Sequence, residues 1–208
     1  MARRFGGGYK SKLVRAERAQ APLLAIACEG QTEARYLQHL GRNRVMRMRP
    51  KVFPGHHGNQ LVDDAVSYAE ELQSRSREPA PVIHRGVIFD LERYTPTTIS
   101  DAKETVIYAS ARGVSVWLSV PTIERWFLLH YAHIAASRSK RVVLEQLKST
   151  LSTAGGPNYR KPGSPRFYGD LLPRSNSAAT ACRASHPSDL NGDGLTCICQ
   201  LLEFLETV

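Results

Sequence analysis

The stretch LLAIACEGQTE, residues 23–33, joins a continuous apolar run to an acidic turn. The run Leu23–Cys28 is typical of a strand that is buried on both faces, as strands in parallel sheets are. A Glu-Gly pair that starts at Glu29 ends the run, and a predicted helix follows over Thr32–Leu40. This stretch therefore predicts a buried strand, a tight turn that carries a carboxylate, and a helix.

The alternation of strand and helix continues outward along the chain. Three further strands are predicted at 48–54, 82–90 and 114–120. Apolar residues recur at helical spacing over about 61–72, 101–112, 123–136, 140–151 and 195–205, whereas 152–176 is basic and Gly/Pro/Ser-rich, with no predicted helix. This order predicts an α/β fold, with a mostly parallel four-stranded sheet, helices on both faces and a helical C-terminal extension.

The length of 208 residues suits one α/β domain with a small appendage. We divide the chain into a basic, flexible N-terminal arm (1–20), a core (21–136) and a basic helical extension packed on the core (137–208). A composition of 42% hydrophobic and 23% charged residues excludes wholesale disorder and coiled coil. No apolar run approaches the roughly 20 residues of a membrane span, and no signal-peptide core is present, so we expect a soluble cytoplasmic protein.

The net charge of +9 is distributed unevenly along the chain. Residues 35–51 carry six basic and no acidic groups, residues 137–174 carry eight against two, and residues 52–136 carry seven against ten. An acidic centre with basic flanks could hold a polyanion around a cation site. Solvated helix faces together with a basic arm are the alternative explanation.

The four cysteines are too few for a disulfide scaffold. Cys197 and Cys199 are two residues apart, and Cys28 and Cys182 lie far away in sequence, so no C-x-x-C spacing occurs. We therefore expect four reduced thiols and no structural zinc site.

Carboxylates follow two of the predicted strands. Glu29 comes after the first strand, and Asp90 and Glu92 come at the end of the third. In an open parallel sheet, the carboxyl ends of the strands line the binding crevice, and residues two apart on an extended backbone face the same way. These three acids are therefore predicted ligands for Mg²⁺ or Mn²⁺, which prefer oxygen donors. Capping or salt bridging at the strand ends is the alternative.

Two further candidates lie on the predicted helix 123–136. Glu124 is near its N-terminus and can point into the same crevice, so it is a catalytic candidate. His130 is also carried as a catalytic candidate, although a histidine among apolar residues is more often part of the core. In the loop before the second helix, His56 and His57 could contact a phosphate or protonate a leaving oxygen.

The run DLNGDG at 189–194 copies the first half of an EF-hand calcium loop. The twelfth position, which needs a bidentate glutamate, is Gln200. We therefore predict a tight turn at 189–194 and no calcium site.

Three motifs together resemble the RloB-like family, bacterial proteins with a Toprim-type core: ACEGQTE at 27–33, FDLE at 89–92 and SVPTIERWFLLH at 119–130. The resemblance implies a Toprim-like, Rossmann-like fold, with Glu29 as general acid or base and Asp90 with its partner as Mg²⁺ ligands. It also implies phosphodiester chemistry, since Toprim cores occur in nucleases, primases and topoisomerases, and a role in phage defence and abortive infection.

Two positions depart from the family pattern. Glu92 stands where the pattern has a second aspartate, and Tyr94 stands where Toprim proteins often have a further acid. The leading prediction is a metal-dependent nuclease in anti-phage defence. A catalytically degenerate module that binds or senses nucleic acid is the alternative, and a phosphohydrolase or nucleotidyl transferase acting on small molecules is a third.

Basic side chains are predicted to hold the phosphate backbone of DNA or RNA without sequence readout. The candidates are Arg35, Arg42, Arg44, Arg125, Arg138, Lys140, Arg141 and Lys161. The sequence leaves open which nucleic acid is bound and whether the chain forms a homo-oligomer or acts with a defence-operon partner.

Overall fold

The computed structural model describes residues 22–43, 46–76, 83–93, 95–132, 134, 139–185 and 196–207. Several predictions fall outside these residues, namely the arm 1–20, the turn 189–194, Tyr94, Arg44 and Arg138. No described helix is long and apolar enough to cross a membrane.

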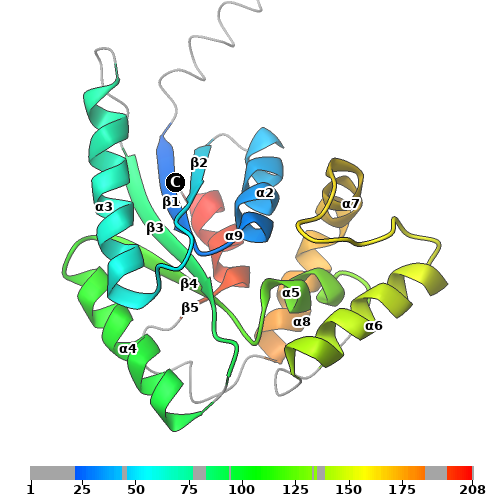
Figure 1. Ribbon diagram of the computed structural model, residues 1–208. Helices are drawn as coiled ribbons and strands as arrows, with labels where there is room; N and C mark the ends of the chain where they lie inside the picture. Colours follow the sequence, from blue (N-terminus) through cyan, green and yellow to red (C-terminus); the bar gives the residue numbers. More distant parts are fainter. Residues whose placement is uncertain are drawn as a thin grey trace, which may run out of the picture.

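A parallel sheet forms the centre of the fold (Figure 1). Its strands are β1 (Leu23–Cys28), β2 (Arg47–Val52), β3 (Ile83–Asp90), β4 (Val114–Ser119) and β5 (Thr196–Cys197), in the order β2-β1-β3-β4-β5. Each neighbouring pair is parallel, which confirms the predicted α/β class. The fifth strand was not predicted, because its two residues are too few to show a strand period.

Strand β1 lies inside the sheet, and all six of its residues are buried. It pairs with β2 on one side and β3 on the other, so that Cys28 is opposite both Val52 and Ile88. A strand with neighbours on both edges and helices on both faces has no contact with water, which accounts for its continuous apolar sequence.

Helices cover both faces of the sheet (Figure 1). On one face, α3 (Gly58–Ser74) and α4 (Pro96–Ser110) pack their apolar side chains against Ala27, Val87 and Phe89. Gly113, with a positive φ of 63°, follows α4 and leads the chain into β4.

The larger apolar cluster lies on the other face, which presents Leu24, Ile26 and Cys28. It includes side chains from α2 (Gln31–Leu40), α5 (Ile123–Leu129), α6 (Lys140–Thr153), α7 (Pro165–Leu171), α8 (Ser175–Ala184) and α9 (Ile198–Thr207). The helices of the C-terminal third therefore share a core with β1.

Two sequence expectations about helices were wrong. The helix predicted over 123–136 ends at Leu129 as α5. The prediction was too long because buried residues, among them Ile134, continue beyond the helix end. In 152–176, where no helix was predicted, α7 begins with Ser164 as its cap and Pro165 in its first turn. These are helix-start signals that the high content of glycine and proline obscured.

The cysteines also differ from expectation. Cys197 and Cys199 form a disulfide bond, whereas Cys28 and Cys182 are free and buried. The prediction of four reduced thiols was therefore wrong for Cys197 and Cys199. The junction of β5 and α9 turns the two side chains toward each other inside the core, which the spacing alone does not reveal.

The absence of a side chain at Gly86 makes room for Trp117. A Cβ atom at Gly86 would lie 2.3 Å from Cζ3 of the Trp117 ring, which is 2% exposed. We expect Gly86→Ala to lower the free energy of unfolding by about 1–3 kcal/mol, the usual cost of overpacking a core. Urea denaturation of wild type and variant measures this loss.

Gly169 in α7 provides the control, because a Cβ there would have 3.8 Å to its nearest neighbour. Gly169→Ala should be neutral or stabilising by up to about 1 kcal/mol, since alanine favours helix. Equal losses of stability in the two variants would contradict the packing argument.

Candidate functional site

The candidate site lies where the strand order of the sheet reverses. From β1 the chain moves to β2 on one side and then returns to β3 on the other. In open α/β sheets, the crevice at such a switch point, outside the carboxyl ends of the strands, is the usual place for a ligand. Glu29 follows β1 and Asp90 ends β3, so both lie at this edge, as predicted.

Glu33, in the first turn of α2, adds a carboxylate that the sequence did not assign to the site. Its side chain folds over Gly30, where a Cβ atom would lie 2.6 Å from Oε2 of Glu33. Glu33 is 5% exposed, and its Oε2 has no hydrogen-bond partner. Burial and the nearby charges of Glu124 and Glu29 raise the pKa of Glu33.

Asp90 joins the end of β3 to the start of α5. Its Oδ1 accepts a hydrogen bond from the backbone N–H of Ile123 at 2.9 Å, and its Oδ2 accepts one from Oγ1 of Thr122 at 2.8 Å. Burial and the charge of Glu33 raise the pKa of Asp90 well above its usual range, and the bond from Thr122 only partly opposes this.

Glu124 is fully buried and is held by three donors. Oε1 accepts from the Tyr159 hydroxyl at 2.8 Å and from Nζ of Lys161 at 2.6 Å, and Oε2 accepts from Oγ1 of Thr122 at 2.5 Å. Burial alone would raise the pKa of Glu124, but these hydrogen bonds outweigh it, so the pKa is lowered.

The Thr122 hydroxyl contacts both Asp90 and Glu124 but carries only one hydrogen. The two contacts together therefore require a second proton. The pKa of Asp90 is raised and that of Glu124 is lowered, so of the two carboxyl groups Asp90 binds a proton more readily.

Glu29 is only partly exposed and lies next to a histidine. Nδ1 of His57 is 3.4 Å from its Oε1. His57 is the residue that precedes α3, and its neighbour His56 instead contacts Oδ2 of Asp64 at 2.5 Å. Of the two loop histidines considered from the sequence, His57 is the one that reaches the site.

Glu92 lies apart from the buried carboxylates. Its side chain is 52% exposed and forms an ion pair with Lys140 at the start of α6. The positive charge of Lys140 also acts on Asp90 and Glu124, so this ammonium group lies close to the site.

The three predicted metal ligands do not form a closed set. Among the described residues, the only group of three or more potential ligand atoms within 4.8 Å of one another consists of cysteines. By the same criterion Glu29, Glu33 and Asp90 do not form a closed set either, but their carboxyl groups interact electrostatically, and Oε2 of Glu33 has no hydrogen-bond partner. Carboxylate oxygens are the ligands that a hard divalent cation prefers. The sequence signal for Glu33 is its place in the helical turn directly after Glu29.

The basic residues predicted to bind nucleic acid differ from one another in their surroundings. Arg35 and Arg42 line a pocket of about 210 Å³ together with His39. Lys161 contacts Glu124, as described above, and the exposed Arg141 pairs with Glu145 of its own helix at 3.3 Å.

Arg125 and His130 lie in the core rather than on a surface. Arg125 is 4% exposed, so it does not present its guanidinium group to a nucleic acid, contrary to the prediction. Nδ1 of His130 donates a hydrogen bond to the backbone oxygen of Trp126 at 2.8 Å, and burial lowers the pKa of His130 to about 4. His130 is therefore a neutral residue of the core.

Comparison with known proteins gives one result. A family model described as RloB-like protein matches residues 24–205. No curated protein and no solved structure shows a significant match.

The raised pKa of Glu33 leads to a prediction about stability and pH. The unfolded carboxyl loses its proton near pH ~4.3, whereas the folded one keeps it to higher pH. Between these two pKa values the folded state binds more protons, so stability falls as pH rises through this window. A glutamine side chain does not ionise, so Glu33→Gln removes this loss of stability. The free energy of unfolding of the variant should therefore rise relative to that of wild type as the pH increases from about 4 to neutrality.

Thermal unfolding between about pH 4 and pH 8, in a chelator, measures this difference. Glu104→Gln, at an exposed position of α4, is the matched control and should follow the wild-type curve. A stability difference between Glu33→Gln and wild type that stays constant with pH would contradict the assignment.

Proposed function

The chain belongs to the RloB-like protein family, and we propose that it is a Mg²⁺- or Mn²⁺-dependent nuclease that acts in bacterial defence against phage. The observation that carries this proposal is the buried group of carboxylates at the switch point of the sheet. Glu33 and Asp90 both have raised pKa values there, which is the electrostatic condition that a bound cation relieves. The motifs at 27–33, 89–92 and 119–130 support phosphodiester chemistry and a defence role by resemblance.

Three carboxylates have roles in the proposed reaction. Glu33 and Asp90 would hold the cation, and Glu29 would complete the site from the end of β1. When bound, the metal ion would polarise the phosphate and offset the charge that develops on its oxygens. Glu29, which is partly exposed and next to His57, would take a proton from water or return one to the leaving oxygen.

Positive side chains on either side of the carboxylates suit a phosphate backbone. Lys161 and Lys140 lie at the carboxylate group, and Arg35 and Arg42 line the pocket beside α2. Such contacts confer affinity without base readout, so they fit DNA and RNA equally.

A second candidate function is a degenerate module that binds nucleic acid without cleaving it. Two ion pairs favour it, since the ammonium groups of Lys140 and Lys161 already neutralise Glu92 and Glu124. In that case the lysines would take the place of the cation, and the site would bind phosphate directly.

Cleavage assays separate the two functions. Labelled single- and double-stranded DNA and RNA are incubated with the protein and Mg²⁺ or Mn²⁺. We expect cleavage that is abolished by a chelator and lowered at least about 100-fold by Asp90→Asn or Glu29→Gln, because each removes a charge from the reacting centre. Both variants should retain nucleic-acid binding.

The exposed Glu104→Gln serves again as the control and should cleave at the wild-type rate. Binding by wild type without cleavage of any substrate would favour the degenerate module. Turnover of nucleoside triphosphates alone, with nucleic acids left intact, would identify a small-molecule enzyme instead.

The pocket beside α2 leads to a separate prediction about salt. Replacing Arg35 and Arg42 by alanine should weaken binding to all sequences alike. It should also reduce the slope of log K against log salt by about 1 for each phosphate group that the variant no longer neutralises. Fluorescence anisotropy at several salt concentrations measures the slope.

Arg75→Ala is the matched control, because Arg75 pairs with Glu71 at the exposed end of α3. An unchanged salt slope in the Arg35/Arg42 double variant would show that the phosphate backbone of the nucleic acid does not contact this pocket.

A further inference from the structure

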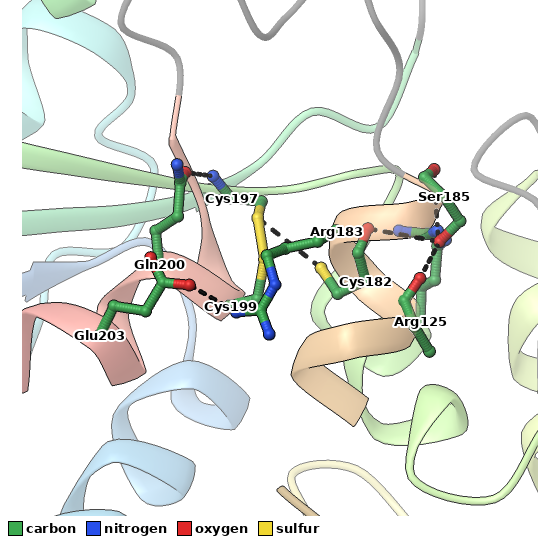
Figure 2. The surroundings of a disulfide bond; sticks show 9 residues. Arg125, Cys182, Arg183, Ser185, Cys197, Cys199, Gln200 and Glu203 are labelled. Atoms are coloured by element: carbon green, nitrogen blue, oxygen red, sulfur yellow. Dashed lines mark hydrogen bonds and ion pairs between the residues drawn. A yellow bond between two sulfur atoms is a disulfide. The ribbon is translucent and has the colours of Figure 1, made fainter. Parts of the chain in front are cut away.

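Three cysteines meet near β5, the edge strand of the sheet (Figure 2). Cys182 comes from α8, Cys197 from β5 and Cys199 from α9. They are 3%, 5% and 0% exposed, and their sulfur atoms all lie within 4.8 Å of one another. The sequence spacing did not predict this cluster, since α8 and α9 are brought together only by the fold.

The disulfide between Cys197 and Cys199 contributes little as a structural link. It joins residues only two apart. In the chain-entropy model, the stabilisation by a disulfide grows with the length of the loop that it closes, so a loop of about three residues gains only on the order of 1–2 kcal/mol. These buried sulfurs therefore suggest a role other than cross-linking.

The distance from the Cys182 sulfur to the Cys197 sulfur is that of two ligands on one metal ion. Sγ of Cys182 lies 3.7 Å from Sγ of Cys197 (Figure 2). Zinc–sulfur bonds of about 2.3 Å in a tetrahedron place neighbouring sulfurs roughly 3.8 Å apart. Cys182 and Cys197 thus already have the spacing of two thiolates on one zinc ion, and Cys199 lies close enough to be the third.

A buried cation beside the sulfurs has no carboxylate to balance it. In the part of the chain that the structure describes, Arg125 forms no ion pair with an acid. Its Nη2 donates to the neutral oxygens of Ile134 and Ser185, and Cys182 is the group that acts on its charge. A divalent cation with three thiolates carries one net negative charge, which would balance Arg125.

A small cavity adjoins Cys182 and Cys197, and two of the residues that line it have a buried polar atom without a partner. The cavity measures about 10 Å³, close to the space that one water molecule needs, and Ser119, Arg125, Cys182 and Cys197 all line it. Oγ of Ser119 and Nε of Arg125 are buried without a hydrogen-bond partner. Buried polar atoms of this kind indicate a missing ligand or water.

We propose that Cys182, Cys197 and Cys199 form a site for a thiophilic divalent cation, Zn²⁺, which is filled when the Cys197–Cys199 disulfide is reduced. Two equivalents of a small thiol reduce the disulfide and are themselves joined as a disulfide. The three protein thiols then release their protons to solvent as their sulfurs bind the ion. The cavity that Ser119, Cys182 and Cys197 line could hold a water molecule as the fourth ligand.

The proposal predicts that the metal content depends on the redox state. Wild-type protein is reduced, equilibrated with Zn²⁺ and freed of excess metal by gel filtration. We expect one zinc per chain by mass spectrometry of the metal, and a sulfur shell at about 2.3 Å by X-ray absorption. Oxidation with diamide should release the zinc and restore the Cys197–Cys199 link in peptide mapping.

Cys182→Ser should lower zinc affinity by more than about 100-fold, because it removes one of three ligands. Cys28→Ser is the matched control, since Cys28 is equally buried but outside the cluster, and it should retain one zinc. Glu33→Gln should also retain it, which keeps this test independent of the proposed nuclease site. If Cys182→Ser does not fold, the X-ray absorption spectrum of zinc-loaded wild type alone tests whether sulfur atoms bind the ion. A reduced wild type that keeps no zinc, or that holds it only through oxygen and nitrogen, would overturn the proposal.

Discussion

The hydrogen bonds of Asp90 to the first residues of α5 are the contact on which the candidate site depends. Asp90 ends β3, and its two oxygens bind Ile123 and Thr122, which fixes the start of α5 against the edge of the sheet. The free N–H groups of a helix N-terminus favour a negative partner, so this position suits a carboxylate. With α5 placed in this way, Glu124 is directed inward toward Tyr159 and Lys161. A long loop that carries Tyr159 is thereby attached to the sheet.

Most of the sheet could be predicted from the sequence, because β1 is buried and apolar throughout, and β3 and β4 each contain a buried apolar run. The carboxyl ends of β1 and β3 followed from the same pattern, and so did the positions of Glu29 and Asp90. Glu33 was missed because a glutamate in the first turn of a helix is most often a simple dipole partner. Only the fold shows that it turns inward over Gly30. The cysteine cluster was missed for a related reason, since it depends on the contact between α8 and α9.

The buried carboxylates require positive charge in any account of their function. Like charges in a poorly solvated site raise one another's pKa values, as Glu33 and Asp90 show. Lysines pair with the exposed Glu92 and the buried Glu124, but Oε2 of Glu33 has no hydrogen-bond partner. The negative charge of these acids is therefore only partly balanced by the lysines. The buried, unpartnered oxygen of Glu33 is the feature that supports the cation site proposed above.

The first turn of α5 connects the carboxylates with the sulfur cluster. Glu124 and Arg125 are consecutive, so their side chains leave the helix about 100° apart, one toward the acids and the other toward Cys182. Thr122 binds Asp90 and Glu124 and also lines the cavity beside Cys182 and Cys197. The two sites therefore share a wall, and α5 cannot shift relative to the cysteines without also moving a residue that holds two of the carboxylates. Because packed cores deform little, the position of this one helix turn is a common constraint on both sites.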